Sequence, residues 1–347
     1  MDVSVEVRPC GAEIDAARDV LVRSTSAGTF FHLARWRDFV AGLYGHVPME
    51  LAAWRGQRLV GVLPLMLCRG LLGSRRLLSI PYAVYGGPVA LDREAELALI
   101  AEAKLLAERR VVSYMELRFE QDPGLDLPGT KLYWTFKREL PEDPAEVLTS
   151  MPKKARAEAR KARTRHGLEL SEGSWYVDDL YRLFLLNKHS LGSPALPPEH
   201  FYRLVERMQG DAVVHLVRRN NEPLSAVMSF AYGDTLIAYY AGTAPNADRN
   251  FSASNFMYMA LQEWAVKRGF RVFDFCRSRG DSGAFQFKVH QGFEPSLLHY
   301  RFHLVSSSAN PAFNPSNPRT AILRNTWART PLWLARRLSR PLARFLA

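Results

Sequence analysis

The sequence predicts an α+β protein made of two tandem copies of one unit, followed by a basic tail. At 347 residues the chain is longer than one hydrophobic core usually supports, which favours two domains. Segments with strand alternation and segments with helical periodicity recur in the same order in both halves. Two pairs of segments also align: LAAWRGQRLVGVLPLML with HLVRRNNEPLSAVMSF, and AELALIAEAKLLAERRVVSYMEL with NFMYMALQEWAVKRGFRVFDF. A duplication explains these alignments better than chance does.

The first copy is expected to span residues 1–142. Alternating apolar residues predict strands at 3–7, 50–54, 58–67, 77–80 and 111–119. A tight turn at Gly56 and Gln57 joins two of these strands. Apolar residues at helical spacing predict helices at 14–22, within TFFHLARWRDFVAGLYG and at 93–109.

The second copy is expected to span residues 143–305. It is preceded by a predicted strand at 131–140 and by a break at 141–144, where two prolines lie. The elements predicted after the break are a long basic helix at 146–166, a helix at 198–208, strands at 212–218, 223–232 and 235–242, a helix at 254–268, and strands at 272–275 and 296–305.

The stretch RVFDFCRSRGDSGAFQFKVHQGFEP, residues 271–295, differs most from ordinary globular sequence. Its β-formers surround Asp274 and lead into a turn rich in glycine and serine. Gly280, Asp281 and Ser282 can cap a short helix, which Gly292 ends. An acid and two arginines beside a helix N-terminus favour binding of anions and acyl oxygens. The alternative, in which Asp274 and an arginine form a structural ion pair, stays open.

The composition, 47% apolar and 23% charged, is typical of a folded soluble protein. No signal peptide is evident, and the longest apolar run, residues 59–68, is about half a membrane span and contains Pro64. Cys10, Cys68 and Cys276 are far apart and show no metal or redox spacing, which fits a reducing cytoplasm. We therefore predict a cytoplasmic protein without a metal site.

The net charge of +11 is unevenly distributed. Seven lysines and arginines against one glutamate lie in KKARAEARKARTR, residues 153–165. This pattern indicates an anionic partner: the phosphates of a nucleotide-linked or lipid-linked substrate, a tRNA, or the inner membrane surface. The alternative, a solvated basic helix without a ligand, stays open.

The tail, residues 306–347, begins with the linker-like SSSANPAFNPSNP, and no acidic residue follows Glu294. The end of the tail combines aromatic and aliphatic residues with arginines, namely Trp327, Leu332, Trp333, Leu334, Leu338, Arg324, Arg329, Arg336, Arg337, Arg340 and Arg344. This mixture suits a short interfacial helix on anionic lipid, which would place the protein on the inner face of the cytoplasmic membrane. Packing on the second domain explains it equally well.

The predicted unit has the layout of a GNAT-type acyltransferase core. The segments MPKKARAEARKARTRHGL, HSLGSPALPPEHF, YYAGTAP and FDFCRSRGDSGAFQFKVHQGFEP follow one another in order. Together they resemble the FemAB family of tandem GNAT-like proteins, most closely those associated with exosortase/PEP-CTERM exopolysaccharide systems. The resemblance covers most of the chain and is densest at residues 151–300. One departure is Cys276, where relatives commonly have the glycine of FDFGRS.

The resemblance implies transfer of an acyl or aminoacyl group onto an amino group, or a hydroxyl, of a cell-envelope or exopolysaccharide precursor. Classical relatives take amino acids from aminoacyl-tRNA and extend peptidoglycan cross-bridges. We expect the active site in the second copy, while the first copy helps to bind an anionic, nucleotide- or lipid-linked glycan precursor. Two alternatives stay open: a CoA-dependent N-acyltransferase of a polysaccharide or small amine, and a basic scaffold bound to membrane or RNA with degenerate GNAT domains.

The candidate catalytic residues are Lys288, Tyr239 and Tyr240. Lys288 matches a lysine of the relatives with a substrate-binding or charge-stabilising role, so we expect it to stabilise an oxyanion. Adjacent tyrosines on a strand point in opposite directions, so one of the two can relay a proton. Cys276 is disfavoured as a nucleophile because the resemblance implies a fold that usually transfers acyl groups directly, without a covalent enzyme intermediate. The residues expected to bind phosphate or carboxylate are Asp274, Arg277, Ser278, Arg279, Lys153, Lys154, Arg156, Arg160 and Arg249.

The loop APNADRNFSASNFM bears on the acyl donor because it contains no glycine. CoA-dependent GNAT proteins usually present a glycine-rich loop whose N–H groups hold the pyrophosphate. Ser252, Ser254 and Asn255 can still cap the next helix, and Arg249 can supply charge. Acetyl-CoA is therefore disfavoured without being ruled out. We expect aminoacyl-tRNA or acyl-CoA as a co-substrate and no tightly bound cofactor.

Overall fold

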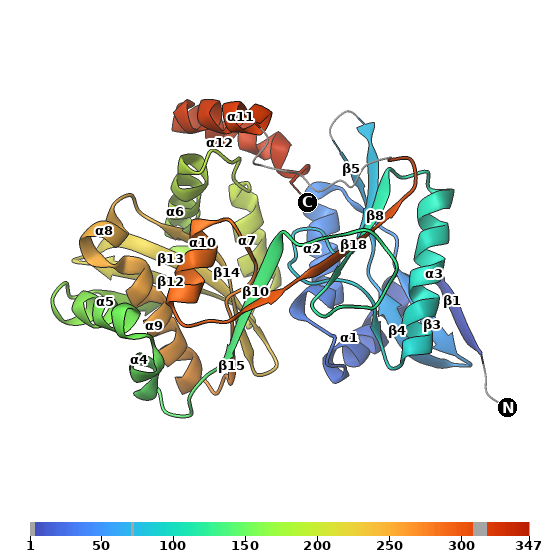
Figure 1. Ribbon diagram of the computed structural model, residues 1–347, viewed down its shortest axis with the longest axis horizontal. Coiled ribbons are helices and arrows are strands. Elements are labelled where there is room, and N and C mark those ends of the chain that lie inside the picture. Colours follow the sequence, from blue (N-terminus) through green and yellow to red (C-terminus); the bar gives the residue numbers. More distant parts are fainter. Residues whose placement is uncertain (1–3, 71–72, 308–317, 347) are drawn as a thin grey trace. The chain divides into compact units, whose positions relative to one another are not determined.

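The computed structural model describes residues 4–70, 73–307 and 318–346 (Figure 1). These residues form two compact units. The first unit contains the described chain up to residue 132, together with residues 297–307 and 344–346. The second unit contains residues 133–296 and 318–343.

The first unit has two sheets, with strand orders β1-β3-β4-β7 and β2-β5-β6-β8-β18-β9. The strands are β1 (Val5–Pro9), β2 (Val47–Pro48), β3 (Leu51–Arg55), β4 (Arg58–Leu63), β5 (Met66–Arg69), β6 (Arg75–Leu78), β7 (Val89–Ala90), β8 (Tyr114–Phe119), β9 (Gly129–Thr130) and β18 (His299–Leu304). Its α-helices in the described residues are α1 (Asp15–Ser24), α2 (Ala34–Tyr44) and α3 (Arg93–Arg109). Leu99 and Ala103 of α3 pack with Leu51 and Leu117 in one buried core.

The single strand predicted at 58–67 is in fact two strands. β4 ends at Leu63, β5 begins at Met66, and the two belong to different sheets. Pro64 lies between them, and proline cannot donate the backbone hydrogen bond that a continuous strand needs.

The second unit has one long sheet, of order β11-β12-β13-β14-β15-β10-β16, with β17 paired to β10. The strands are β10 (Tyr133–Glu139), β11 (Glu169–Glu172), β12 (Ala212–Arg219), β13 (Glu222–Tyr232), β14 (Thr235–Thr243), β15 (Val272–Asp274), β16 (Ser278–Arg279) and β17 (Pro295–Leu297). The helices are α4 (Glu146–Ser150), α5 (Lys153–Thr164), α6 (Val177–Ser190), α7 (Pro198–Arg207), α8 (Ala247–Phe251), α9 (Ala253–Lys267), α10 (Gly283–His290), α11 (Pro318–Arg329) and α12 (Leu332–Ala343).

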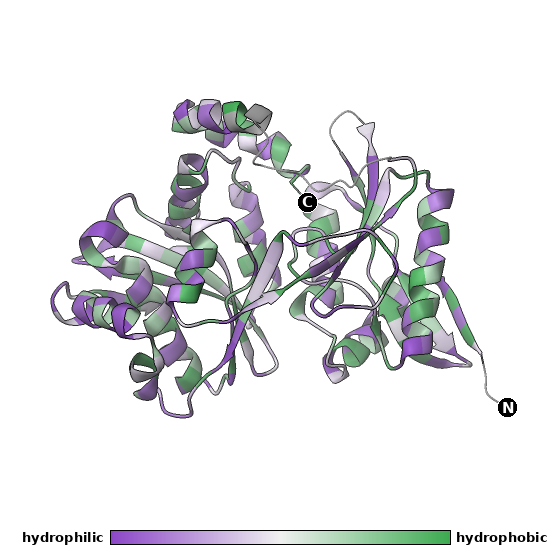
Figure 2. Cartoon of the chain, in the orientation of Figure 1, coloured by the Kyte–Doolittle hydropathy of each residue, from purple (hydrophilic) through white to green (hydrophobic). Residues whose placement is uncertain are grey.

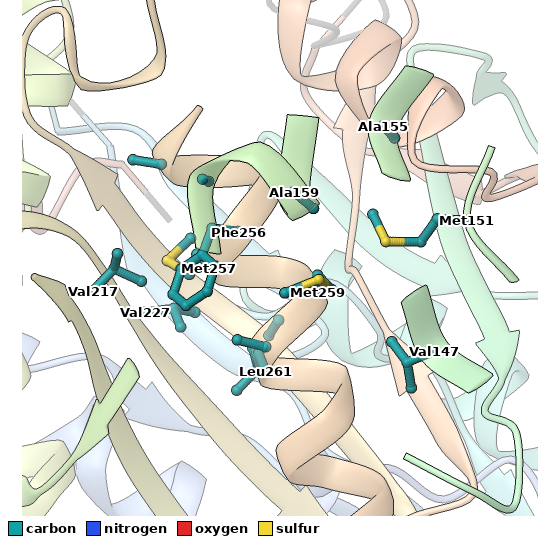
Figure 3. Packing of buried hydrophobic residues seen from close by; sticks show 14 of the residues in the cluster. Val147, Met151, Ala155, Ala159, Val217, Val227, Phe256, Met257, Met259 and Leu261 are labelled. Carbon is teal, nitrogen blue, oxygen red and sulfur yellow. The ribbon is translucent and has the colours of Figure 1, made fainter. Parts of the chain in front are cut away.

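Helices α5 and α9 cover one face of this sheet, and α6 covers the other (Figure 1). Phe256 and Met257 of α9 pack with Val217 and Val227 of the strands in a buried core (Figure 3). Helix α5 approaches α9 closely because its buried residues are alanines, Ala155, Ala159 and Ala162. Phe273 of β15 and Phe275 belong to the same core, so its burial holds in place the end of β15, which carries the candidate site.

The long basic helix predicted at 146–166 is interrupted. Met151 has an extended backbone, with φ −74° and ψ 149°, between α4 and α5. Pro152 follows it, and a proline ring disfavours the helical conformation of the preceding residue. Helix α6 was not predicted at all, although Leu180, Leu183 and Phe184 have the apolar spacing of a helix.

Two strands lie in the unit opposite to the one that their sequence position suggested. β10 precedes residue 142 but lies between β15 and β16 in the second unit. β18 precedes residue 305 but pairs with β8 and β9 in the first unit. The units are therefore divided at residues 132 and 296 rather than at 142 and 305. Sequence order alone cannot reveal such an exchange, because each strand has the same alternation in either sheet.

The exchange predicts how fragments of the chain fold. A fragment of residues 133–296 retains β10 and its fully buried Phe136, whereas a fragment of residues 143–296 leaves an empty position between β15 and β16. We expect a cooperative thermal transition, followed by circular dichroism, for the longer fragment and none for the shorter one. Equal transitions in both fragments would contradict this expectation.

The predicted repeat is confirmed by one shared feature. In the first unit β6 and β8 pair in parallel and α3 connects them; in the second unit β14 and β15 pair in parallel and α9 connects them. The predicted helical tail is present as α11 and α12, while most of the linker before them, residues 308–317, lies outside the described residues.

Candidate active site

The candidate site lies where β14 and β15 separate. The two strands pair in parallel over only three positions, and the last pair joins Ile237 to Asp274. β15 ends there, while β14 continues to Thr243 with β13 as its neighbour. Backbone beyond a parted parallel pair is a common place for ligands in α/β sheets.

A bulge in β14 sets the direction of the two candidate tyrosines. Tyr240 pairs with Met228 and Ala238 with Ser229, so Tyr239 is the extra residue. A bulge reverses the alternation of the side chains that follow it. Ala238 lies in the core below α9, whereas Tyr240 packs on the α6 side. Alternation alone could not have predicted this reversal.

Tyr240 is buried among aromatic rings. Its ring centroid lies 6.0 Å from that of Phe184, 5.3 Å from that of Phe201 and 5.0 Å from that of His200. Tyr239 is only half-buried, with its ring 4.6 Å from that of Tyr240. Of the two, Tyr239 is the better placed to meet a substrate.

The turn after β15 has an unusual backbone that polar groups hold in place. Cys276 has a φ of +57°, in the left-handed region that residues other than glycine rarely adopt. The Cys276 N–H donates to Oδ1 of Asp274 at 2.7 Å. Asp274 therefore fixes this turn, and Lys137 lies 3.9 Å from its other oxygen. The glycine common in relatives at position 276 fits the same conformation.

Cys276 itself is a poor nucleophile. Burial first, and then the negative charge of Asp274, raise the pKa of its thiol well above the usual range. The thiolate is the reactive form, so this thiol is inert at neutral pH.

Lys288 closes the other side of the turn. From α10 its buried ammonium group donates to the carbonyl oxygens of Phe275, of Cys276 at 2.9 Å and of Arg277 at 3.2 Å. An ammonium group has three N–H donors, so all three are used. The predicted cap is also present, because Oγ of Ser282 accepts from the Phe285 N–H at 3.2 Å. Lys288 thus contacts the predicted turn, although in this state it has no donor left for an oxyanion.

The charge of Lys288 predicts a pH effect on stability. Burial is the main reason that its pKa is lowered from 10.5 to about 8. Between these values the unfolded chain still binds a proton that the native chain has released, so stability rises with pH. We expect the free energy of unfolding of the wild type, relative to Lys288→Met, to increase from about pH 8 to about pH 10 in denaturant titrations. A constant difference would contradict the lowered pKa.

The arginines of the turn present cationic groups beside it. The Arg277 guanidinium stacks 4.7 Å from the ring centroid of Tyr133. Arg279 donates to Asp281 at 2.8 Å, but its buried Nε has no hydrogen-bond partner among the described residues. Ser278, between the two arginines, is buried. Asp274 caps the turn through the Cys276 N–H and lies near Lys137; its pairing with Arg277 stays a prediction.

Lys188 is a further cation that the sequence analysis missed. It lies near the end of α6, with Nζ 5.3 Å from the ring centroid of Phe184. Burial first, and then the charge of Arg277, lower its pKa. Within the described part of the chain, the ammonium group of Lys188 has no hydrogen bond or ion pair. The apolar spacing of residues 180–184 could have predicted α6, and with it the position of Lys188 near the helix end.

The remaining predicted residues lie apart from the turn, on helices. Lys153, Lys154 and Arg160 are exposed on α5, and Arg156 donates to the Thr149 carbonyl at 3.1 Å. Arg249 is exposed on the short helix α8. The structure places these side chains on the surface of the second unit without direct contacts to Lys288.

The N-terminus of α9 is already occupied by a side chain. Asp248 accepts from the Ser254 N–H at 2.7 Å and from its hydroxyl at 2.9 Å. The Ser252 hydroxyl donates to Glu158. A carboxylate at a helix N-terminus satisfies the groups that would otherwise bind a phosphate.

Comparison with known proteins defines the class of this site. Residues 149–289 match the family model of the acetyltransferase (GNAT) domain. Within the second unit, these residues are therefore similar in sequence to a GNAT domain. No curated protein matches the chain in sequence. Among the described residues, no group of histidine, cysteine, aspartate or glutamate side chains could hold a metal ion.

Three solved structures show the same tandem fold. FemX has a TM-score of 0.66 at 15% identity, over 87% of this chain and 98% of its own. A tandem GNAT protein from the clavulanic acid biosynthesis pathway has a TM-score of 0.52 at 14% sequence identity. The match covers 88% of this chain and 100% of that protein. L-PGS from Bacillus licheniformis has a TM-score of 0.53 at 13% sequence identity. The match covers 90% of this chain and 96% of that protein. The predicted tandem GNAT architecture is confirmed.

Proposed function

We propose that this protein is a FemAB-like transferase that moves an aminoacyl or acyl group onto an amino group, or a hydroxyl, of a cell-envelope or exopolysaccharide precursor. The observation that carries the proposal is the cationic turn at the point where β14 and β15 separate. Lys188, Arg277 and Arg279 surround a turn whose backbone Asp274 and Lys288 hold in a strained conformation. Backbone strain of this kind is retained mainly where a function requires it.

In the proposed reaction an acceptor amine attacks the carbonyl carbon of an aminoacyl ester. A C–N bond forms, the ester C–O bond breaks, and the amine proton passes to the leaving hydroxyl. The developing oxyanion needs a positive charge nearby. Lys288 supplies this charge and keeps the turn in place; direct contact with the oxyanion would require one of its three carbonyl partners to be released. Tyr239 is the candidate for the proton relay.

The guanidinium groups of Arg277 and Arg279 would bind phosphate or carboxylate groups of the substrates. Guanidinium is planar and can bind such groups through two hydrogen bonds at once. An anionic, nucleotide- or lipid-linked glycan precursor would satisfy these cations, with the first unit contributing to acceptor binding. The exposed Lys153, Lys154 and Arg160 would bind further phosphates, including those of tRNA.

The α9 N-terminus favours aminoacyl-tRNA over acyl-CoA as the donor. Asp248 takes the Ser254 N–H, and its negative charge would repel a pyrophosphate. We therefore expect no calorimetric signal when acetyl-CoA is titrated into the full chain at micromolar concentration. Saturable binding of acetyl-CoA, weakened by Arg249→Ala, would favour the CoA-dependent alternative.

The activity itself is tested by label transfer. Wild-type protein is incubated with labelled aminoacyl-tRNA or labelled acyl-CoA and a lipid-linked glycan precursor, and label in the precursor is counted. The proposal predicts transfer from aminoacyl-tRNA. Absence of transfer from both donors, combined with loss of tRNA or vesicle binding when residues 153–165 are charge-reversed, would favour the scaffold alternative.

A further inference from the structure

Helices α11 and α12 both contact α6 of the second unit, and α12 packs there through small residues. Ala335, Ser339 and Ala343 of α12 are buried, and the Ser339 hydroxyl accepts from the Ala195 N–H at 3.1 Å. The carbonyl of Thr330, between the helices, accepts from His189 of α6 at 2.7 Å. The tail helices are therefore docked, although the docking leaves several of their large apolar residues exposed.

Several large apolar residues of both helices are exposed, whereas Trp327 and Leu334 are half-buried. Ile322 and Leu323 of α11 are 69% and 71% exposed, and Trp333 and Leu338 of α12 are 68% and 41% exposed. Hydrophobic and hydrophilic segments lie side by side on both helices (Figure 2). Clustered exposure of large apolar side chains is uncommon on a protein without a partner for them.

The charges between these apolar residues are all positive. Arg340 pairs with Glu199, and Arg336 lies 5.5 Å from the ring centroid of Tyr181. In contrast, Arg324, Arg329 and Arg337 are exposed, and no carboxylate of the described residues pairs with them. The sequence provides no acidic residue anywhere after Glu294. We call these three arginines, with Ile322, Leu323, Trp333 and Leu338, the tail surface.

We propose that the tail surface binds the surface of an anionic lipid bilayer. Tryptophan and branched aliphatic side chains insert at the boundary between headgroups and acyl chains, while arginines contact the lipid phosphates. This mode fits the described helices, none of which is long and apolar enough to cross a bilayer. The inference goes beyond the transfer reaction and does not depend on the identity of the donor.

Other occupants fit these observations less well. A second copy of the chain would bring two sets of unpaired arginines together, which like-charge repulsion opposes. RNA would use the arginines but leave Ile322, Leu323 and Leu338 in water. Helix α5 makes the distinction clear, because it exposes Lys153, Lys154 and Arg160 between buried alanines and presents no large apolar side chain.

The test is co-sedimentation of the full chain with vesicles of phosphatidylcholine alone or of equal parts phosphatidylcholine and phosphatidylglycerol. We expect binding to the anionic vesicles only. Removal of three charges by R324Q/R329Q/R337Q should weaken it about a hundredfold. I322S/L323S/W333S should also weaken it at least about tenfold. The matched control K153Q/K154Q/R160Q removes the same number of charges from α5 and should bind as the wild type does.

Several outcomes would overturn the proposal. They are equal binding to both vesicle types, no binding to either, or a loss in the α5 control as large as in the arginine variant. Dimers of the wild type that I322S/L323S/W333S abolishes in sedimentation velocity would identify a second copy as the occupant. Since the substituted side chains are exposed, unchanged thermal unfolding is expected for every variant, and transfer from soluble substrates should persist even where vesicle binding is lost.

Discussion

Replacement of Lys288 by methionine is expected to lower the rate of group transfer by about 10²- to 10³-fold, the usual effect of removing one oxyanion-stabilising group. Methionine keeps an unbranched stem next to the rings of Phe136 and Phe275, which the Lys288 ammonium now approaches at 5.2 and 5.1 Å. It removes the charge and releases three carbonyl groups of the turn. The measurement is kcat/KM for label transfer, with thermal unfolding recorded in parallel.

Arg277→Ala is the companion variant, because its guanidinium takes no part in the carbonyl contacts of Lys288. We expect a higher KM for the anionic substrate, with little loss of stability. A fully active Lys288→Met protein would show that the lysine only supports the turn in an enzyme whose chemistry lies elsewhere. Normal activity in both variants would remove this turn from the proposed mechanism.

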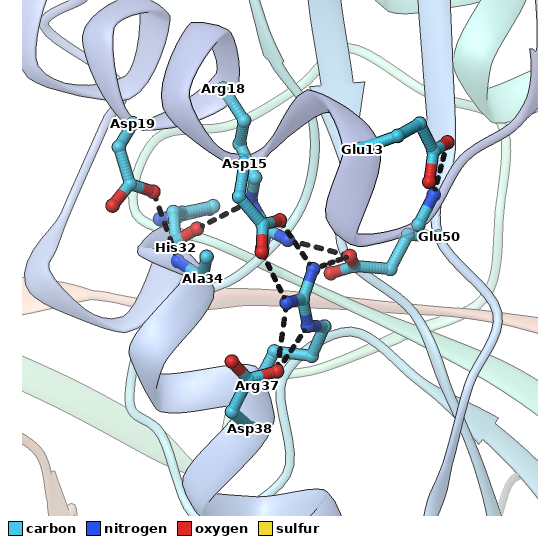
Figure 4. A network of polar contacts seen from close by, with 10 residues as sticks. Glu13, Asp15, Arg18, Asp19, His32, Ala34, Arg37, Asp38 and Glu50 are labelled. Atoms are coloured by element: carbon cyan, nitrogen blue, oxygen red, sulfur yellow. Dashed lines mark hydrogen bonds and ion pairs between the residues drawn. The ribbon is translucent and has the colours of Figure 1, made fainter. Parts of the chain in front are cut away.

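Replacement of Glu50 by alanine is expected to destabilise the first unit by about 3 to 5 kcal/mol, the cost of leaving buried charges unpaired. One oxygen of Glu50 pairs with Arg18 at 2.6 Å and with Arg37 at 3.0 Å (Figure 4). All three side chains are at least 94% buried, with relative exposures of 4%, 2% and 6%. Arg37 would keep Asp15 at 2.6 Å and Asp38 at 2.7 Å, whereas Arg18 would lose its carboxylate and keep the His32 carbonyl at 3.0 Å.

Denaturant unfolding of the full chain gives the measurement, read from the transition of the first unit. Arg55→Ala is the matched control, since its ion pairs with Asp92 and Glu94 lie at the surface, where solvent screens them and they contribute little to stability. A Glu50→Ala protein as stable as this control would mean that water or a shift of Asp15 compensates both arginines.

The helices and strands were predicted well where a local property of the segment, such as apolar periodicity or a capping residue, determines its structure. Periodicity predicted α3 at its exact bounds, and the capping pattern predicted α10, with Ser282 among the three residues proposed as its cap. Pro64 and Pro152 were visible in the sequence. Their effect was underestimated, because the strand and the helix predicted across them are each interrupted there. Helix bounds, caps and proline interruptions depend on a residue and its close neighbours, so they can be predicted from a single sequence.

Features that depend on pairing between distant strands were not predictable. The exchange of β10 and β18 and the bulge at Tyr239 both follow from hydrogen-bond register. The candidate site shows the same division. The stretch around Asp274 and Lys288 was located, whereas the use of all three Lys288 donors by carbonyl groups follows only from the folded turn.

The most direct test of the proposed function is a double-label reaction with the wild-type protein. Aminoacyl-tRNA and acetyl-CoA carry different radiolabels and compete in one tube for a lipid-linked glycan precursor, and the ratio of the two labels in the product is counted. Because Asp248 occupies the α9 N-terminus, we predict that the label from aminoacyl-tRNA predominates and that Lys288→Met removes it. A product labelled only from acetyl-CoA would contradict the proposed donor, and an unlabelled product would contradict the transferase function itself.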